Sequence, residues 1–545
     1  MHRTGRAAPF NKESWFFRDE VIFVSNPGQG KAGGSDRRRN AAGRERNRSE
    51  PRGFSTAAPS ERTRRADPAR LVAFEVLRAV AADDAYANLV LPVSIRKHKL
   101  DKRDAGFATE LAYGALRGQG TYDAVLAKCV DRPLEKLDPA ILDALRIGTH
   151  QLLAMRVPAH AALDQTVGLA RAVIGAGPSA LINAVLRRVS SKSLEEWTAE
   201  LTAGLTDATK ISSLTHSHPE WIVRALRQAL VDHGRDVSEI ETLLAANNAA
   251  PVVNLLALPG LGSLDEAFEA GAVPGELAEG SALFSAGDVG RLESIRTGTT
   301  RVQDAGSQLV ARALAAVKLE PVESEAVKPE AAEDGAGSVK TGAAGHSEQW
   351  LDLCAGPGGK SALLGALAQQ RGNTLVANEP LEHRAQLVRQ ALRPLDPAVW
   401  SVRVGDGRTV AEDFPDTFDR VLVDAPCTGL GALRRRPEAR WRRKPSDIAG
   451  LGKLQRELLA AALTAVRPGG VVAYVTCSPH PAETSAVVQD CLRRRDDVEL
   501  IDAGAVLDGV SLTGSLAAGH ESTAQLWPHV HGTDAMYLAL IRRTA

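Results

Sequence analysis

Two cysteines stand in proline-containing turns that directly follow apolar, strand-like segments. Cys427 lies in DAPCTG (424–429) and Cys477 lies in TCSP (476–479). A strand-end thiolate is a soft nucleophile that can add to carbon-6 of a pyrimidine, which turns carbon-5 into an enamine able to attack an electrophilic methyl group. The second thiol could then assist removal of the carbon-5 proton and release of the product. Two structural cysteines are the competing interpretation, because single cysteines in apolar strands usually belong to the core.

A glycine-rich turn, DLCAGPGGKS (352–361), follows another apolar segment. Glycines at a strand-to-helix turn let the backbone approach a ligand and aim the amides of a helix N-terminus at it. A phosphate-binding P-loop would need glycine where Cys354 stands, and the dinucleotide pattern GxGxxG is absent because the glycines occupy 356, 358 and 359. A nucleoside whose recognition needs no phosphate fits this spacing.

Two carboxylates end the next two strand-like segments. Glu379 follows the glycines by roughly 20 residues, where a carboxylate can accept both ribose hydroxyls of an adenosine-type cofactor. Asp406 lies in GDG (405–407) and could accept the adenine amino group. Either acid alone could be a solvated strand end, but two acids and a glycine loop at successive strand ends indicate adenosine recognition.

A parallel sheet is needed to bring these residues together. Apolar segments alternate with helical ones at 350–353, 374–377, 400–404, 418–423 and 471–475. Strands that alternate with helices and are buried on both faces predict a doubly wound parallel sheet. Ligands of such sheets bind beyond the carboxyl ends of the strands, which is where the glycine loop, the acids and both cysteines stand.

The sequence upstream of this domain predicts helices. Asp-Pro pairs at 67–68 and 138–139 combine an N-cap with proline at the first helical position, and apolar residues follow each at helical spacing. The same spacing recurs over 181–189, with no intervening run of β-branched residues. We predict an all-α domain over 67–190.

Composition sets the other boundaries. We expect a disordered Arg-rich tail over 1–66, a helical linker with a small α/β connector over 191–300, and the α/β domain over 301–545. Within the last of these, about 319–349 is rich in Glu, Ala, Gly, Lys and Ser and predicts a disordered acidic insertion.

Overall charge gives no sign of a nucleic-acid partner, since Lys+Arg and Asp+Glu both number 66. The basic stretch 434–444 follows the Cys427 turn and could clamp phosphates, while Trp441 within it is expected to serve packing. The five cysteines are odd in number and lack metal-ligand spacing, which argues against disulfides and zinc and favours a reducing cytoplasm. No segment predicts a signal peptide or a membrane span.

The motifs DLCAGPGGK, DAPCTG and TCSP, in this order, resemble the signature blocks of RNA 5-methylcytosine methyltransferases of the Sun/Fmu (RsmB) type. The helical region is similar to the NusB-like RNA-binding domain of that subfamily, notably in RDAGFATEL (103–111) and RVPAHAA (156–162). VQDAGSQ (302–308) resembles the block that closes over the cofactor. The resemblance covers 67–545 except the insertion, and DAMY (534–537) departs from the family pattern.

The resemblance implies methylation of carbon-5 of a cytosine in RNA, with small-subunit ribosomal RNA as the target. It implies that Cys477 is the nucleophile that forms a covalent adduct at carbon-6 and that Cys427 assists release. Asp424 and Lys360 would hold the cytosine and polarise its ring.

The resemblance also implies S-adenosylmethionine as cofactor. Glu379 would bind its ribose, Asp406 its adenine, and Asp424 would lie near its methionine end. The loop would supply the remaining contacts, through Cys354, Ala355, Gly356, Pro357, Gly358, Gly359 and Lys360. Cys354 is then adjacent to the cofactor rather than catalytic.

Two alternatives stay open. Transfer RNA could replace ribosomal RNA as the substrate, and a NusB-like antitermination factor would be a non-enzyme. The second would leave Cys427, Cys477 and Glu379 without a shared purpose, and a dehydrogenase or NTPase would not need thiols at these strand ends. Family analogy implies a monomer that acts without a metal or a membrane.

Overall fold

The computed structural model describes residues 66–285, 287–320 and 347–544. They form two compact units, one from the N-terminal part up to 194 and one from 195 to the C-terminus that also includes 116–124. The predicted Arg-rich tail, except Ala66, lies outside the described residues. The same holds for most of the predicted acidic insertion.

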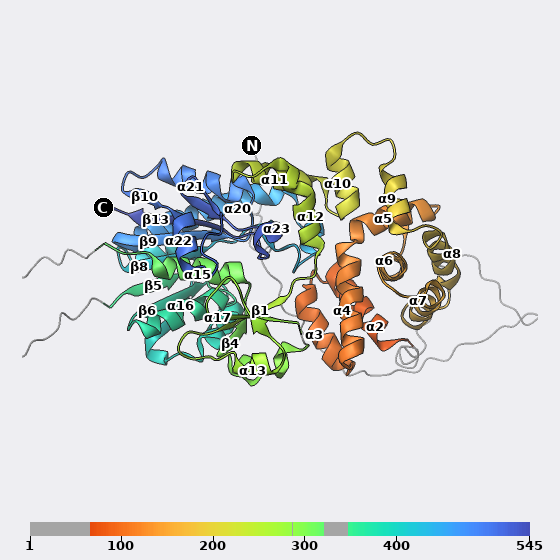
Figure 1. Ribbon diagram of the computed structural model, residues 1–545, viewed down its shortest axis with the longest axis horizontal. Helices are drawn as coiled ribbons and strands as arrows, with labels where there is room; N and C mark the ends of the chain where they lie inside the picture. The colour runs from red at the N-terminus through yellow and green to blue at the C-terminus, as the bar shows by residue number, and fades with distance from the viewer. Residues whose placement is uncertain (1–65, 286, 321–346, 545) are drawn as a thin grey trace, which may run out of the picture. The chain divides into compact units, whose positions relative to one another are not determined.

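The N-terminal unit is built from helices, as the apolar spacing predicted (Figure 1). Both predicted Asp-Pro helix starts are confirmed, because Asp67 accepts a hydrogen bond from the backbone N of Arg70 and Asp138 from that of Ala140, each at 2.8 Å. The helices of this region are α2 (Pro68–Ala82), α3 (Ala87–Lys97), α4 (Lys102–Arg117), α5 (Gln119–Cys129), α6 (Pro139–Leu153), α7 (Ala159–Val173) and α8 (Ser179–Val189).

A helical stretch and a small sheet follow. The helices are α9 (Leu194–Thr202), α10 (Ala208–His216), α11 (Glu220–Asp232) and α12 (Ile240–Asn248). The predicted α/β connector is an antiparallel sheet of order β2-β3-β1-β4, made of β1 (Val253–Ala257), β2 (Val273–Pro274), β3 (Ser281–Phe284) and β4 (Thr300–Val302), with α13 (Asp265–Glu269) and α14 (Glu293–Thr297).

The remaining strands form a nine-stranded sheet of order β11-β12-β13-β9-β8-β5-β6-β7, in which β10 also pairs with β13. Its strands are β5 (Gln349–Asp352), β6 (Thr374–Glu379), β7 (Trp400–Val404), β8 (Phe418–Asp424), β9 (Val466–Thr476), β10 (Val498–Ile501), β11 (Gly519–His520), β12 (Thr523–Gln525) and β13 (Tyr537–Arg543). The strands from β5 to β9 pair in parallel and confirm the five predicted strands.

Helices cover both faces of this sheet (Figure 1). One face packs against α15 (Ala305–Ala316), α16 (Gly359–Gln370), α17 (Glu382–Leu392) and α22 (Ala503–Val510), and the other against α18 (Val410–Asp413), α20 (Pro445–Ala465) and α21 (Ser485–Leu492). Two short helices, α19 (Ala439–Arg442) and α23 (Pro528–His531), complete the domain. Because the strand order reverses between β5 and β8, the carboxyl ends of these two strands flank the usual ligand crevice.

The sheet is mixed rather than parallel throughout, which corrects the sequence-based expectation. β13 returns antiparallel to β9, with Tyr537 opposite Thr476, and β10 and β12 pair antiparallel with β13. β11 and β12 are two and three residues long, too short to show a period-2 pattern. This pairing brings the start of β13 next to the turn that carries Cys477.

The C-terminal end of the predicted insertion is ordered. Glu348 accepts hydrogen bonds from Trp350 Nε1 and Arg420 Nε, each at 2.7 Å. No helix within the described ranges is both long and apolar enough to cross a membrane.

Candidate active site

The structure brings the two predicted cysteines into contact. Cys427 lies just beyond the end of β8 and Cys477 just beyond the end of β9, and these strands are parallel neighbours. Their sulfur atoms are 3.4 Å apart. A backbone link fixes the second turn, because Gly431 N donates to Cys477 O at 2.9 Å.

The pKa values of the two thiols are shifted in opposite directions. A hydrogen bond from the Cys427 thiol, helped by the positive charges of Lys360 and Arg436, lowers the pKa of Cys477 against the effect of burial. The same hydrogen bond, together with burial, raises the pKa of Cys427 well above its usual value. Of the two thiols, Cys477 is therefore the one that ionises more readily, and Cys427 is the one that keeps its proton.

Lys360 and Asp424 form an ion pair beside the cysteines. Lys360 Nζ lies 2.8 Å from Asp424 Oδ2, and the side chains are 12% and 29% exposed. Burial disfavours the ammonium, but the Asp424 carboxylate outweighs it and raises the pKa of Lys360. A fixed, desolvated cation thus stands at the carboxyl end of β8.

The glycine loop lies against the carboxylate of Glu379. A Cβ added to Gly356 would come within 2.2 Å of Glu379 Oε2, and one added to Gly358, whose φ is 101°, within 2.4 Å of the Ala391 Cβ. Arg384 Nη2 donates to Gly356 O at 2.9 Å. The turn therefore packs closely against the Glu379 carboxylate and against α17, which side chains at these two positions would disturb.

The base of the loop carries a buried acid that sequence reasoning did not single out as a site residue. Asp352 accepts a hydrogen bond from Ser361 Oγ at 2.7 Å, while its Oδ1 atom is buried without a partner among the described residues. Burial, with the nearby Asp424, raises the pKa of Asp352 to about 7. Burial and the Asp352 charge raise the pKa of the adjacent Cys354 well above its usual value, so this thiol is a poor nucleophile. The buried acid and the glycine cradle suit a nucleoside cofactor better than a phosphate.

Asp406 lies at the same edge of the sheet but is already engaged. Its carboxylate accepts from the Arg408 backbone N at 2.9 Å and pairs with the Arg408 guanidinium. These bonds lower the pKa of Asp406. An adenine amino group that binds to Asp406 would therefore share its carboxylate with Arg408.

Part of the basic stretch after Cys427 is internal, which corrects the expectation that all of it faces RNA. Arg440 is 0% exposed and donates to the backbone oxygens of Arg117, Ser217 and Asn247 and to Asn248 Oδ1. Burial lowers the pKa of Arg440 to about 9. Trp441 packs beside Gly120, as expected for a packing residue.

Arg434 and Arg435 bind carboxylates from distant parts of the chain. Asp304, which caps α15 in the predicted cofactor-closing block, lies 3.2 Å from Arg434 Nη2, and Asp534 pairs with Arg435. Burial and the Asp534 charge raise the pKa of Asp304 to about 6. This cluster ties the segment after Cys427 to α15 and to the start of β13.

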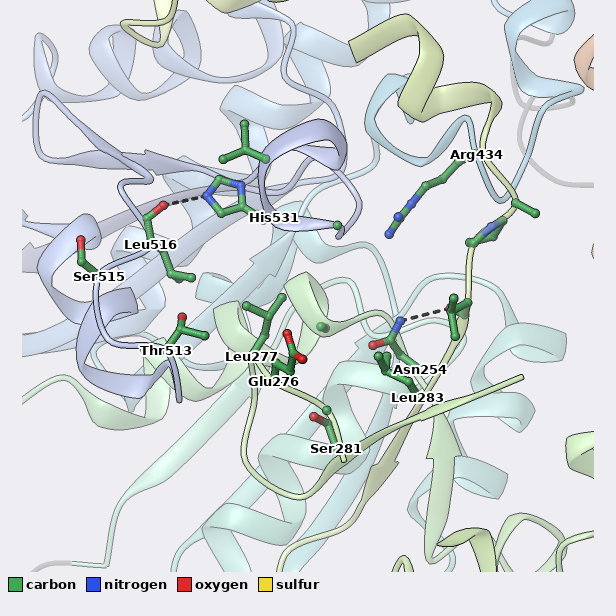
Figure 2. Close-up of a pocket in the computed structure, with 17 residues that line it drawn as sticks. Asn254, Glu276, Leu277, Ser281, Leu283, Arg434, Thr513, Ser515, Leu516 and His531 are labelled. Atoms are coloured by element: carbon green, nitrogen blue, oxygen red, sulfur yellow. Dashed lines mark hydrogen bonds between the residues drawn. The ribbon is translucent and has the colours of Figure 1, made fainter. Parts of the chain in front are cut away.

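A cavity of about 560 Å³ is lined by Arg434, by residues of the small sheet and by residues at the end of α23 (Figure 2). The Arg434 side chain points into it from one side, with Asn254 and Ser281 of the small sheet below and His531 opposite. None of the predicted catalytic or cofactor residues lines it. Within the described ranges, no group of three or more His, Cys, Asp or Glu side chains could hold a metal ion.

Comparison with known proteins agrees with this arrangement. Residues 342–542 match the family model described as 16S rRNA methyltransferase RsmB/F, and 67–191 match that of the NusB family. A putative methyltransferase of Mycobacterium tuberculosis is 47% identical over 485 residues, which covers 88% of this chain and 98% of that protein. A probable ribosomal RNA small subunit methyltransferase B of Bacillus subtilis is 27% identical over 485 residues, covering 87% and 98%.

The fold also matches a solved structure. The crystal structure of PH0851 superposes with a TM-score of 0.69 at 19% identity, covering 88% of this chain and 99% of that one. The sequence relatives and the two family models together show that the chain belongs to the RsmB (Sun/Fmu) family of S-adenosylmethionine-dependent RNA methyltransferases, with a NusB domain at its N-terminal side.

Proposed function

We propose that this enzyme methylates carbon-5 of a cytosine in small-subunit ribosomal RNA through a covalent adduct between Cys477 and carbon-6. The observation that carries the proposal is the 3.4 Å contact between the sulfur atoms of Cys477 and Cys427 at adjacent strand ends, with the pKa of Cys477 lowered by its hydrogen bond to Cys427. Methyl transfer to a nitrogen or oxygen needs no thiol, because the acceptor atom has its own lone pair. Carbon-5 of cytosine has none, and a nucleophile at carbon-6 supplies the electrons.

In the first step, Cys477 Sγ bonds to carbon-6 and the electron pair of the 5,6 double bond moves into the ring. Lys360 carries a fixed positive charge next to this sulfur, and it stabilises the negative charge that develops on the ring. Asp424, the partner of Lys360, orients the cytosine through its N–H groups.

Held by the glycine loop and Glu379, S-adenosylmethionine would supply an electrophilic methyl group to carbon-5 and would leave as the neutral thioether. Bonding of Cys477 to carbon-6 removes the hydrogen bond and the negative charge that raise the pKa of Cys427, so Cys427 releases its proton to solvent and then takes the proton of carbon-5. The electrons of that C–H bond restore the double bond, and Cys477 leaves as a thiolate. The site returns to its starting state, with the proton on Cys427 and the charge on Cys477.

The cofactor residues follow the same proposal. The glycine loop from Cys354 to Lys360 contacts the cofactor, and Glu379, which is 2% exposed at the end of β6, binds its ribose hydroxyls. Asp406, which lies just beyond the end of β7 and pairs with Arg408, accepts the adenine amino group. The close approach of Gly356 to Glu379 supports this part, since it places the backbone of the loop beside the carboxylate proposed to bind the ribose.

Ribosomal RNA is supported as the substrate by the NusB match over 67–191 and by the relative named for the small ribosomal subunit. The test is transfer of a labelled methyl group to unmodified small-subunit ribosomal RNA and, separately, to unmodified transfer RNA, followed by nucleoside analysis. Label in 5-methylcytidine of ribosomal RNA is the expected result. Label in transfer RNA alone would overturn the target, and label in another nucleoside would overturn the chemistry.

For variants of Cys427 or Cys477, the matched control is the half-buried Cys491 of α21, which packs against the core of the sheet. Cys491→Ala is expected to keep the activity of the unmodified enzyme. Loss of activity in this variant would mean that the assay reports general damage to the fold.

A further inference from the structure

A buried carboxylate behind the two cysteines takes no part in the chemistry described above. Glu483 ends the 3-10 helix η7 (Pro481–Glu483) and is 0% exposed. The hydrogen-bond donors around its carboxylate are neutral groups. An ionised carboxylate is costly to bury, so this one is held where several donors converge on it.

The donors come from the residues that follow each cysteine. Thr428, next to Cys427, donates its backbone N to Glu483 Oε1 at 2.8 Å and its hydroxyl to Oε2. Ser478, next to Cys477, donates its hydroxyl to Oε2 at 2.7 Å. One carboxylate therefore joins the turn after β8 to the turn after β9.

Further contacts fix this link from behind. Gln455 of α20 donates to Glu483 Oε1 at 3.2 Å and to Pro426 O at 2.8 Å, so it reaches the residue before Cys427 as well. Tyr474, a buried residue of β9, donates its hydroxyl to Glu483 O at 2.7 Å. The position of the carboxylate is thus set by the helix and by the strand that carries Cys477.

We propose that Glu483 is the positioning residue of the cysteine pair, holding the two turns in the register at which the sulfur atoms touch. The proposal rests on the proposed function for its meaning, because the contact between the sulfurs matters only if both thiols act on the same base. Glu483 does not touch the reacting atoms, and it acts through Thr428 and Ser478.

Glu483 also contributes to the charge around Cys427. The hydrogen bond to Cys477 and burial raise the pKa of Cys427 most, and the carboxylates of Glu483 and Asp424 raise it further. The hydrogen bond from Cys427 lowers the pKa of Cys477, and the charges of Lys360 and Arg436 lower it further. The negative charge of Glu483 therefore helps to keep the resting proton on Cys427, which leaves Cys477 as the nucleophile.

The test compares Glu483→Ala and Glu483→Gln with a matched control, Asp419→Asn. Asp419 is also a 0% exposed carboxylate of β8, at the end of the strand away from Cys427, where it accepts from Gln349 N and Arg467 Nε at 2.7 Å. The glutamine variant keeps an acceptor for Thr428 N and can donate to both hydroxyls, so it removes the charge and preserves the link. Thermal melting of each full-length variant reports folding.

Two readouts are used. Methyl transfer to RNA gives kcat and the RNA KM. The rate of iodoacetamide alkylation is measured against pH, and separate quantification of the Cys427 and Cys477 peptides gives the titration of each thiol. For Glu483→Ala we expect kcat to fall by about 100-fold with the RNA KM changed by no more than about twofold, the cost of misplacing a reacting group by roughly 1 Å. Glu483→Gln is expected to recover at least about tenfold of this loss, with Cys427 titrating at lower pH than in the unmodified enzyme.

Retention of kcat by Glu483→Ala, an equal loss of kcat in a folded Asp419→Asn, or an unchanged titration of Cys427 in Glu483→Gln would each overturn the proposal. If the alanine variant does not fold, the glutamine variant decides through the titration. A methylated nucleoside other than 5-methylcytidine would overturn the proposed function alone, since the thiol titrations do not depend on the product.

Discussion

The division of labour between the two cysteines depends on a few neighbouring charges. Lys360 and Arg436 are the cations that lower the pKa of Cys477, while Asp424 opposes them. The same Asp424 raises the pKa of Cys427. Asp424 thus raises the pKa of both thiols, and the positive charge of Lys360, added to the hydrogen bond from Cys427, favours ionisation of Cys477.

Replacing Lys360 tests this bias. Lys360→Met removes the nearest cation and leaves Asp424 uncompensated, and both effects raise the pKa of Cys477. A thiol whose pKa rises is less ionised at neutral pH, so alkylation of Cys477 at pH about 7 is expected to slow by about fivefold or more, with the midpoint of its pH profile at higher pH. Lys453→Met, at a side chain that is 80% exposed on α20, is the control and should leave the profile in place. An unshifted midpoint in Lys360→Met would show that the cation does not set the acidity of Cys477.

Residue types and spacing were enough to predict the main parts of this site. Both cysteines, Lys360 and Asp424 were expected at strand ends, and parallel strands end at one edge. Their contact followed because β8 and β9 are neighbours. The role of Glu483 could not be predicted, since a single glutamate in a polar turn carries no sign that it will be buried among donors from two other segments.

At the scale of elements, the turn between β5 and α16 is the part of the fold that we propose contacts the cofactor. A Cβ at Gly356 would displace the ends of the Glu379 and Arg384 side chains, and one at Gly358 would collide with the Cβ of Ala391. Gly359, the first residue of α16, has nothing within 4 Å of the position a Cβ would take.

This difference gives a matched pair of variants. Gly356→Ala would press a methyl group against Glu379, so we expect the Kd for S-adenosylmethionine to rise by about tenfold or more, equivalent to about 1.4 kcal/mol. Gly359→Ala should leave the Kd within about twofold, because alanine also favours the helix. Isothermal titration calorimetry with cofactor measures both, and equal effects of the two variants would contradict the account of the loop.

Contacts between residues far apart in the chain explain which parts of the structure could not be predicted from the sequence. Arg435 and Asp534 are 99 positions apart, and Arg440 bonds to Ser217 across 223 positions. Such pairs leave no local pattern, so the basic stretch looked uniform although part of it is internal. The antiparallel strands β11 and β12 were missed for the opposite reason, because they are too short to have a pattern at all.

At the scale of the whole molecule, the chain divides into two compact units. The C-terminal unit contains every residue proposed to act on the cytosine or the cofactor, and the N-terminal unit contains most of the NusB match. The overall charge is balanced, so any attraction to RNA must come from local clusters. Exposed basic residues around the start of α4 form one such cluster in the N-terminal unit, made of Lys99, Lys102 and Arg103.

Removing this cluster tests its part in RNA binding. The triple variant Lys99→Gln, Lys102→Gln and Arg103→Gln is expected to raise the RNA KM about fivefold at about 0.15 M salt. It should also flatten the dependence of log affinity on log salt by roughly 0.7 to 0.9 for each phosphate that is no longer neutralised. The Kd for S-adenosylmethionine should not change. As a control in the same unit, Lys128→Gln with Lys136→Gln alters exposed lysines outside the cluster. An equal rise of the RNA KM in both variants would mean that RNA responds to net charge and not to this surface.

The covalent adduct is the most direct test of the central claim. RNA is incubated with S-adenosylmethionine and the unmodified enzyme, Cys427→Ala or Cys477→Ala, and the products are separated under denaturing conditions. A protein–RNA adduct is expected to accumulate with Cys427→Ala, because release is impaired, and neither adduct nor methylation is expected with Cys477→Ala. Full methylation by Cys477→Ala, or the absence of any adduct with a folded Cys427→Ala, would contradict it.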